Sequence, residues 1–422
     1  MKISISLTMV LVALYSIGLS NESFIIRMIE NNQMLSYLFA IDSGRYLKYY
    51  NFSLLSLRKL LIIFAFSLVL IIIIKNIRRK TLRVNPIDFL NIYFFLYCFL
   101  TGLRGDFNVA AYYLFYTFLI IIMLYFVSIA DYNYLFKYIV IAGVINCILI
   151  ISQFIQIWKI YNYDISVIWI LRPVGGLDDA TLAASFVAMC LFILNIVRNQ
   201  MRRYQVVLCM LLFILGGILT GSRTFIIILM FYLGFTFFRG INKNIHFKII
   251  LFSTSLSLLL LIFMKNVSSI LESGFYNQII GRLFDISDRT SILTTAFDLL
   301  GYFSIWELFF GIGSNNYDNY VYQFLQVQGS VPHNIFISML VDHGLFGLTF
   351  YITFIIINYI LLRKNLAKSN AATNIKIIYI IFVISSFTEN LNYSYAHMAV
   401  LILITAVAKV AGKKENTRIL KT

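Results

Sequence analysis

Charged residues are scarce in this chain. Of its 422 residues, 12% are charged and 60% are hydrophobic, and its mean hydropathy is +0.86. A soluble domain cannot bury so much apolar surface, so the composition indicates a polytopic membrane protein. The apolar runs, such as 60–74 and 107–129, are continuous. They therefore favour transmembrane helices over the alternating strands of a membrane barrel.

Cysteine and proline are also rare. The 4 cysteines lie in apolar runs and show no metal-ligand spacing, so the sequence implies neither a disulfide framework nor a cysteine metal site. The 3 prolines fall at the edges of apolar runs. The first apolar stretch, 3–19, lacks a small-residue cleavage site, and we expect it to be a retained helix rather than a signal peptide.

Several common functional motifs are missing. No GxxxxGK[ST] sequence is present, which argues against an ATP-driven machine. There is no HExxH sequence of the zinc proteases, and no glycine-rich dinucleotide fingerprint follows a strand. We therefore expect no nucleotide cofactor.

The apolar runs predict about twelve transmembrane helices in an all-α fold. Residues 1–422 are expected to form a single integral membrane domain. The predicted spans are 3–19, 54–74, 87–103, 107–129, 135–157, 180–197, 205–220, 224–239, 248–264, 334–361, 376–392 and 395–411.

Clusters of basic residues follow the second, sixth, eighth and tenth spans and form the C-terminal tail. When the spans alternate across the membrane, the clusters of Lys and Arg fall on one side, which predicts that both termini are cytoplasmic. The net charge of +16 is then explained by anchoring to anionic lipid rather than by nucleic acid. The longest outward loop is 265–333. It is rich in aromatic and aliphatic residues, so we expect it to be ordered, with a helix near 289–300.

Four arginines are predicted to face outward near the membrane surface: Arg172, Arg223, Arg282 and Arg289. A guanidinium group is always charged, and its planar donors match a phosphate. Such a cluster would suit a phosphate-linked lipid substrate. The alternative is that each arginine reaches the interface or pairs with a neighbouring carboxylate. Arg223 is the strongest candidate, because its loop is short.

His333 is predicted to lie at the outer end of a span, just before Asn334. A histidine titrates near neutral pH and could take a proton from a sugar hydroxyl; the alternative is a helix-start residue bonded to backbone. Tyr317 and the aromatic residues after it could stack on sugars, or could belong to the interfacial aromatic belt. Asp342 and His343 could form a buried pair within a span.

Three short segments together resemble the bacterial O-antigen polymerase and ligase superfamily. They are Gly311-Ile312-Gly313-Ser314-Asn315-Asn316, Pro332-His333-Asn334-Ile335-Phe336-Ile337 and Asp342-His343-Gly344-Leu345-Phe346-Gly347-Leu348. Gly221-Ser222-Arg223-Thr224 resembles the Ser-Arg element of the family, Arg289 its loop arginine, and Arg172-Pro173-Val174-Gly175-Gly176 an outer-loop segment. Asp342 stands where the family more often has glutamate.

The resemblance implies a GT-C-like, multi-pass glycosyltransferase of the bacterial inner membrane. Its donor would be a glycan on undecaprenyl pyrophosphate at the outer leaflet, and the reaction would be inverting and would need no metal. His333 would be the catalytic base, with Arg223 and Arg289 completing the catalytic set. Five further residues would bind substrate: Arg172, Arg282, Asn334, Tyr317 and Asp342.

Three functions remain open at this stage. We favour a polymerase that joins repeat units into O-antigen or capsular polysaccharide, with a chain-length regulator as a candidate partner. The second is a ligase that transfers glycan to lipid A core. The third is a flippase or other transporter of lipid-linked oligosaccharide, which is disfavoured because the middle of the spans is nearly free of charge.

Overall fold

The computed structural model describes residues 67, 70, 71, 86–129, 132–160, 173, 175, 180–239, 287–326, 334–366, 370–387 and 394–413. The predicted spans 3–19 and 248–264, and nearly all of 54–74, lie outside these residues. Within the described ranges every regular element is a helix, as predicted.

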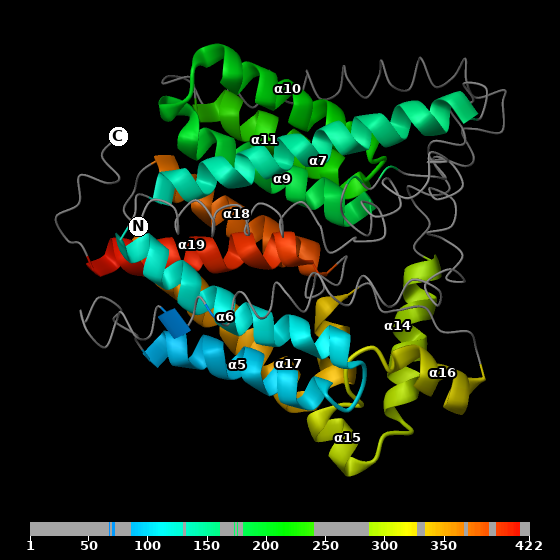
Figure 1. Ribbon diagram of the computed structural model, residues 1–422. Helices are drawn as coiled ribbons and strands as arrows, with labels where there is room; N and C mark the ends of the chain where they lie inside the picture. Colours follow the sequence, from blue (N-terminus) through cyan, green and yellow to red (C-terminus); the bar gives the residue numbers. More distant parts are fainter. Residues whose placement is uncertain are drawn as a thin grey trace.

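The helices of the bundle lie side by side, and short connections reverse the chain between several of them (Figure 1). In chain order the elements are α5 (Pro86–Gly102), α6 (Phe107–Ile129), α7 (Tyr132–Ile160), α9 (Ala180–Val197), the 3-10 helix η2 (Arg198–Gln200), α10 (Arg203–Leu219), α11 (Arg223–Arg239), α14 (Ser287–Leu300), α15 (Ile305–Phe310), α16 (Tyr317–Leu325), α17 (Ile335–Asn365), α18 (Asn370–Ser386) and α19 (Tyr395–Lys413).

Among the described residues, three helices are long and apolar enough to cross a membrane by length and composition: Asn133–Ile155, Ala180–Gln200 and Ile335–Asn365. Shorter apolar helices lie beside them. Every predicted span within the described residues is a helix, although 376–392 is displaced to Asn370–Ser386. Its first turn is polar, so hydropathy placed the start too late. The full span count and the cytoplasmic position of the termini stay predictions.

Helix α9 is the centre of one part of the bundle. It packs against α7, α10, α11 and α18, and 89% of its apolar segment is buried. Small residues let these helices approach closely, as is usual in membrane proteins. Gly143 of α7 lies against Cys190 of α9. A Cβ on this glycine would stand 2.6 Å from the sulfur.

Helices α5, α6, α17 and α19 form a second part of the bundle. Near the start of α5, Asp88 forms a buried ion pair with Lys409 of α19. One turn further along, Asn91 exchanges two hydrogen bonds of 3.2 Å with Asn358 of α17. These contacts satisfy polar groups that would be costly to bury alone. We call these four residues the paired cluster.

Helices α14, α15 and α16 lie at the opposite end of α5 from the paired cluster (Figure 1). They come from the predicted outer loop, and the predicted helix at 289–300 is confirmed by α14. They have a small core of their own, which takes one residue from α17. Its buried members are Ala296, Leu299, Ile312, Tyr317, Val321 and Val341.

Candidate active site

The turn 311–316 joins α15 to α16 and docks against α17. The backbone N–H groups of Ile312 and Gly313 donate to the carbonyl oxygens of Val341 and Asp342, each over 3.0 Å. These acceptors are available because α17 is broken at Gly344, where φ is +72°. A helix break exposes carbonyl oxygens that need partners. The turn supplies those partners and fixes the loop helices to the bundle.

Two glycines allow this close approach, one on each side. Gly311 has φ +76°, and a Cβ there would stand 2.3 Å from the carbonyl of Asp342. Gly344 faces the other way, where a Cβ would stand 2.3 Å from the carbonyl of Phe309. Both the backbone conformation and the space therefore require glycine. The Gly-x-Gly turn and the Gly-x-x-Gly segment predicted from sequence are thus two halves of one packing contact.

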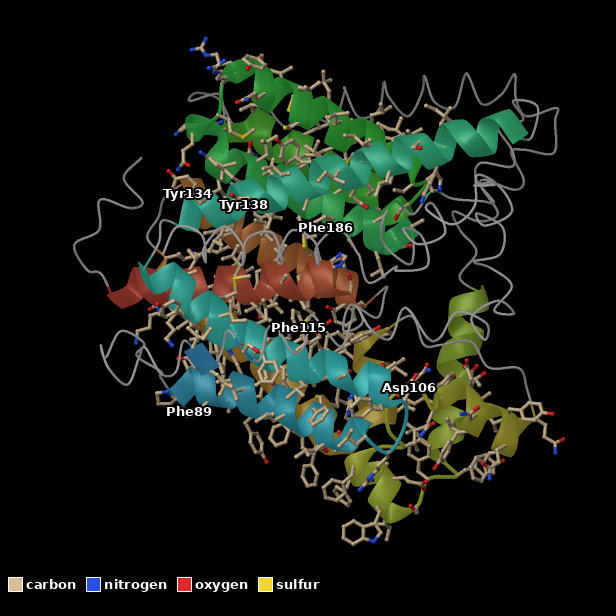
Figure 2. The ribbon with its side chains drawn as sticks, viewed as in Figure 1. Phe89, Asp106, Phe115, Tyr134, Tyr138 and Phe186 are labelled. Carbon is tan, nitrogen blue, oxygen red and sulfur yellow. The ribbon has the colours of Figure 1, made fainter. Side chains whose placement is uncertain are left out.

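The α5–α6 turn closes the other side of the same segment. The backbone N–H of Asp106 donates to the carbonyl of Ser314 over 2.8 Å. Asn316 Nδ2 donates to the carbonyl of Ile312 over 2.9 Å. Figure 2 shows Asp106 in this turn, on the side that faces the loop helices. Residues 311–316 therefore lie between the α5–α6 turn and the break in α17.

His343 occupies the centre of the assembly, just before the break. Its Nδ1 lies 2.7 Å from Thr101 Oγ1 and its Nε2 lies 3.1 Å from Tyr113 Oη. Tyr97 donates to the backbone carbonyl of His343 over 2.9 Å. The imidazole is fully buried. Both ring nitrogens are occupied, so His343 joins α5 and α6 to α17 and is not placed to meet a substrate.

Asp342 is also buried, at 4% exposed. Its carboxylate accepts a hydrogen bond from Ser338 Oγ over 2.9 Å. The two neighbours Asp342 and His343 thus direct their side chains to different partners. Both residues are buried, as expected, and their hydrogen bonds join Asp342 to Ser338 and His343 to Thr101 and Tyr113.

Asn334 caps the start of α17. Its Oδ1 accepts from the backbone N–H groups of Phe336 and Ile337 at 2.9 and 3.4 Å. Its Nδ2 donates to the carbonyl of Phe387 over 3.3 Å, and the Phe336 and Phe387 rings stack at 4.6 Å. Asn334 therefore fixes the helix start that directly follows His333. His333 itself lies outside the described residues.

Tyr317 faces the small core of the loop helices and is only 3% exposed. Burial, followed by the neighbouring charge of Asp318, raises the pKa of Tyr317 to about 12. The ring offers no open face for a sugar in this structure. The most exposed aromatic side chains of the described loop helices are instead those of Tyr322 on α16 and Trp306 on α15.

The predicted arginines fall at different places. Arg223 is the first residue of α11, after a tight turn in which Gly221 has φ +62°. Arg289 lies in the first turn of α14, which contacts α16 and α17. Helix α11 contacts α9 and α10, and the gathering of these two arginines at one site stays a prediction. Arg172 and Arg282 lie outside the described residues.

The segment that follows Arg172 is nevertheless anchored. Gln153 of α7 donates from Nε2 to the carbonyl of Gly175 over 2.8 Å and accepts from its N–H over 2.8 Å. Pro173 and Gly175 are both buried. Gly175, within the outer-loop segment predicted from sequence, is therefore fixed to α7.

Sequence reasoning missed Arg104, which lies in the α5–α6 turn. Its Nη1 donates to the carbonyl of Gly311 over 3.3 Å, and its guanidinium lies 5.7 Å from the centre of the Phe310 ring. It belongs to no recognised motif. The only available signal was its predicted outward position in a short loop, which it shares with Arg223.

Glu307 lies near Arg104 and is held by its own helix. Its carboxylate accepts from Ser304 N, Ser304 Oγ and Tyr320 Oη at 2.7–2.8 Å. Burial alone would raise the pKa of Glu307, but these hydrogen bonds and the charge of Arg104 outweigh it and lower the pKa. Burial and the bond to Glu307 raise the pKa of Tyr320.

No group of three His, Cys, Asp or Glu side chains gathers as a metal site in the part of the chain that the structure describes. The groups of this region described above are hydrogen-bond donors and a guanidinium group. The fold defines a class of membrane protein: an all-helical bundle with apolar spans and an ordered helical loop bound to one end. In such a protein, chemistry can occur where the loop meets the bundle.

The comparison with protein families is more specific. The family model described as O-Antigen ligase matches residues 207–352. The matched region begins in α10 and ends in α17, so it contains the turn before α11, the loop helices and the break at Gly344. It confirms the resemblance to the O-antigen polymerase and ligase superfamily. No curated protein matches the chain.

Proposed function

We propose that this protein is a glycosyltransferase that joins undecaprenyl-pyrophosphate-linked oligosaccharide repeat units into O-antigen or capsular polysaccharide. The reaction would take place at the outer leaflet of the bacterial inner membrane. One observation carries the proposal: the region matched by the family model is the region in which the loop helices, the turn 311–316 and the broken α17 form one assembly.

In the proposed reaction, a hydroxyl of the acceptor sugar attacks the anomeric carbon of the donor glycan. The new C–O glycosidic bond forms as the bond from that carbon to the pyrophosphate oxygen breaks. His333 accepts the hydroxyl proton, and the polyprenyl pyrophosphate leaves with the bonding electrons. Attack from the face opposite the leaving group inverts the anomeric configuration.

Arg223 and Arg289 would hold the pyrophosphate and stabilise the negative charge that develops on it. Arg172 and Arg282 would add phosphate contacts. Because the leaving group is already a good one, positioned cations can supply the electrostatic stabilisation without a metal.

Asn334, Asp342 and Tyr317 would support this chemistry indirectly. Asn334 sets the start of α17 and with it the position of His333. Asp342 presents its backbone carbonyl to the turn 311–316. Tyr317 packs in the core of the loop helices. In this proposal the three residues position the site rather than contact sugar.

A ligase that transfers glycan to lipid A core is the second candidate, because the description of the matching family names that activity. We favour the polymerase, since the chain carries a minimal motif set and polymerases vary most in sequence. Both reactions would use the same donor and the same residues that bind its pyrophosphate. The acceptor distinguishes them.

Complementation separates these two functions. The gene is expressed in one strain that lacks its own polymerase and in another that lacks its own ligase, and lipopolysaccharide and capsule are resolved by size. The polymerase predicts glycans longer than one repeat in the first strain only. Surface glycan restored in the second strain without any lengthening in the first would establish the ligase instead.

A further inference from the structure

Arg104 is a positioned cation that uses little of its hydrogen-bonding capacity on the residues that the structure describes. Its side chain is exposed, yet it is held by the carbonyl of Gly311 and by the face of the Phe310 ring. The hydrogen bond to Gly311 uses one of its five N–H donors. Among the described residues, no carboxylate forms an ion pair with it. A guanidinium in this state is suited to an anionic ligand.

An exposed aromatic surface adjoins this arginine. Ring contacts join Trp306 to Phe310 at 5.7 Å, Phe310 to Phe346 at 5.4 Å and Phe309 to Phe346 at 5.5 Å. Trp306 is 70% exposed, and Phe309 and Phe346 are each about 40% exposed. We call these four residues the aromatic cluster. Exposed rings beside apolar helices can contact lipid chains directly.

The aromatic cluster is continuous with the apolar flank of the bundle. Helix α15 packs on α17 and lies beside the ends of α17 and α5 (Figure 1). Leu100 and Leu103, near the end of α5, are exposed there as well. On the same helix Phe89 is 63% exposed and points away from the bundle (Figure 2). Apolar side chains are therefore exposed both along α5 and on the aromatic cluster, where a lipid chain can contact them.

We infer that Arg104 and the aromatic cluster form a docking edge for a prenyl diphosphate, with the diphosphate on Arg104 and the prenyl chain along the rings. Charge complementarity and the continuous apolar surface select a lipid with an anionic head. The identity of that lipid as the donor rests on the proposed function. The edge brings the donor to the side of the turn 311–316 before transfer begins.

Glu307 provides a control variant that should change binding in the opposite direction from Arg104→Gln. Its charge interacts with that of Arg104, so it weakens the attraction of this edge for an anion. Glu307 also completes a capping box with Ser304 at the start of α15. Glutamine serves equally well at that position of a capping box. Glu307→Gln therefore removes the charge and keeps the helix.

The test uses the full-length protein in phosphatidylcholine nanodiscs and a photoactivatable benzophenone analogue of farnesyl pyrophosphate. Labelled peptides are quantified by mass spectrometry, with farnesyl pyrophosphate, farnesol, inorganic pyrophosphate or phosphatidylglycerol as competitors. We expect labelling on 302–310 and 344–350. Arg104→Gln should lower it about tenfold, as expected for the loss of a charged hydrogen bond. Arg104→Lys should be intermediate, and Glu307→Gln should raise labelling at least twofold.

Matched variants separate this edge from general effects. Arg203→Gln removes the same charge in an exposed arginine at the start of α10 and should leave labelling unchanged. Trp306→Ala should lower labelling several-fold, whereas Tyr322→Ala, which removes an equally exposed ring from α16, should not. Melting curves establish whether each variant is folded. If Arg104→Gln does not fold, Arg104→Lys takes its place in the comparison.

Labelling of Arg104→Gln at the wild-type level would overturn the inference. If Arg104→Gln does not fold, labelling of Arg104→Lys at the wild-type level would overturn it. Competition by phosphatidylglycerol as strong as that by farnesyl pyrophosphate would also overturn it, since the edge would then be an ordinary site for anionic lipid. The proposed function fails separately: a wild-type protein that labels as expected but transfers no glycan keeps the docking edge and loses the enzyme. A protein that makes polymer while Arg104→Gln labels normally keeps the enzyme and loses the docking edge.

Discussion

The polar groups at the two ends of α5 have different surroundings. At its start, the paired cluster buries a carboxylate against an ammonium group and one amide against another. At its other end, the hydroxyl groups of Thr101 and Tyr113 form hydrogen bonds with the buried imidazole of His343, and the charged Arg104 stays exposed. A buried charge must be compensated and so serves the fold. An exposed, positioned charge keeps its donors for a ligand.

Breaking the ion pair of the paired cluster should have the largest effect on stability. Lys409→Met alone leaves Asp88 charged and buried, and should lower the free energy of unfolding by about 3–5 kcal/mol. The double variant Asp88→Leu/Lys409→Met removes both charges and should be close to wild type. Thermal unfolding in detergent measures both proteins. Equal destabilisation of the single and double variants would show that the charge pairing does not matter.

The glycine contact at the other end should come second. Gly344→Ala and Gly311→Ala each place a methyl group against a backbone carbonyl at a positive φ, and each should cost about 1–3 kcal/mol. Gly301→Ala is the matched control, because its Cβ would stand 3.2 Å from its nearest neighbour and its φ is not positive. The same unfolding measurement applies. A Gly344→Ala protein as stable as Gly301→Ala would contradict the close packing described here.

The cap of α17 should have a smaller effect. Asn334→Ala removes the side-chain acceptor for two N–H groups and should cost about 1 kcal/mol. Asn334→Asp keeps the acceptor and should recover most of that loss. If Asn334 only positions His333, glycan transfer should follow stability in both variants. Transfer lost equally in Asn334→Asp and Asn334→Ala would show that the amide contacts substrate.

The smallest effect should be the pH dependence of α15. The folded pKa of Glu307 lies below its ordinary value of 4.5, so its contribution to stability is present above pH 4.5 and is lost as pH falls through the folded value. Glu307→Gln should remove this step. The fluorescence of Trp306, measured in a Trp158→Phe/Trp169→Phe protein during acid titration, tests it. An identical acid transition in Glu307→Gln would contradict the assignment.

The sequence predicted the helices well because each long apolar run has one outcome in lipid. It also singled out the Gly-x-Gly turn and the segment that contains Gly344, but it predicted a continuous span over 334–361, and so neither the break at Gly344 nor the contact between the two segments. That contact depends on segments brought together only by folding. The same holds for Asp88 and Lys409, which lie on helices far apart in the chain and carry no local pattern.

The candidate site was less predictable than the fold. Asn334 and Tyr317 are polar groups whose local sequence suits a ligand, yet the structure uses one as a cap and the other in a core. Arg104 was overlooked because nothing in its neighbouring sequence distinguishes it. Its role became visible only through the Phe310 ring and the Gly311 carbonyl. Side-chain roles depend on tertiary neighbours, which periodicity does not report.

The most direct test is a transfer assay with the purified protein and an undecaprenyl-pyrophosphate-linked repeat unit, followed by separation of the products by size. The wild-type protein should form products of two or more repeats, and His333→Ala should lower the rate by about 10²–10⁴ while keeping the wild-type melting temperature. Wild-type rates in His333→Ala, Arg223→Ala and Arg289→Ala would contradict the proposed enzyme.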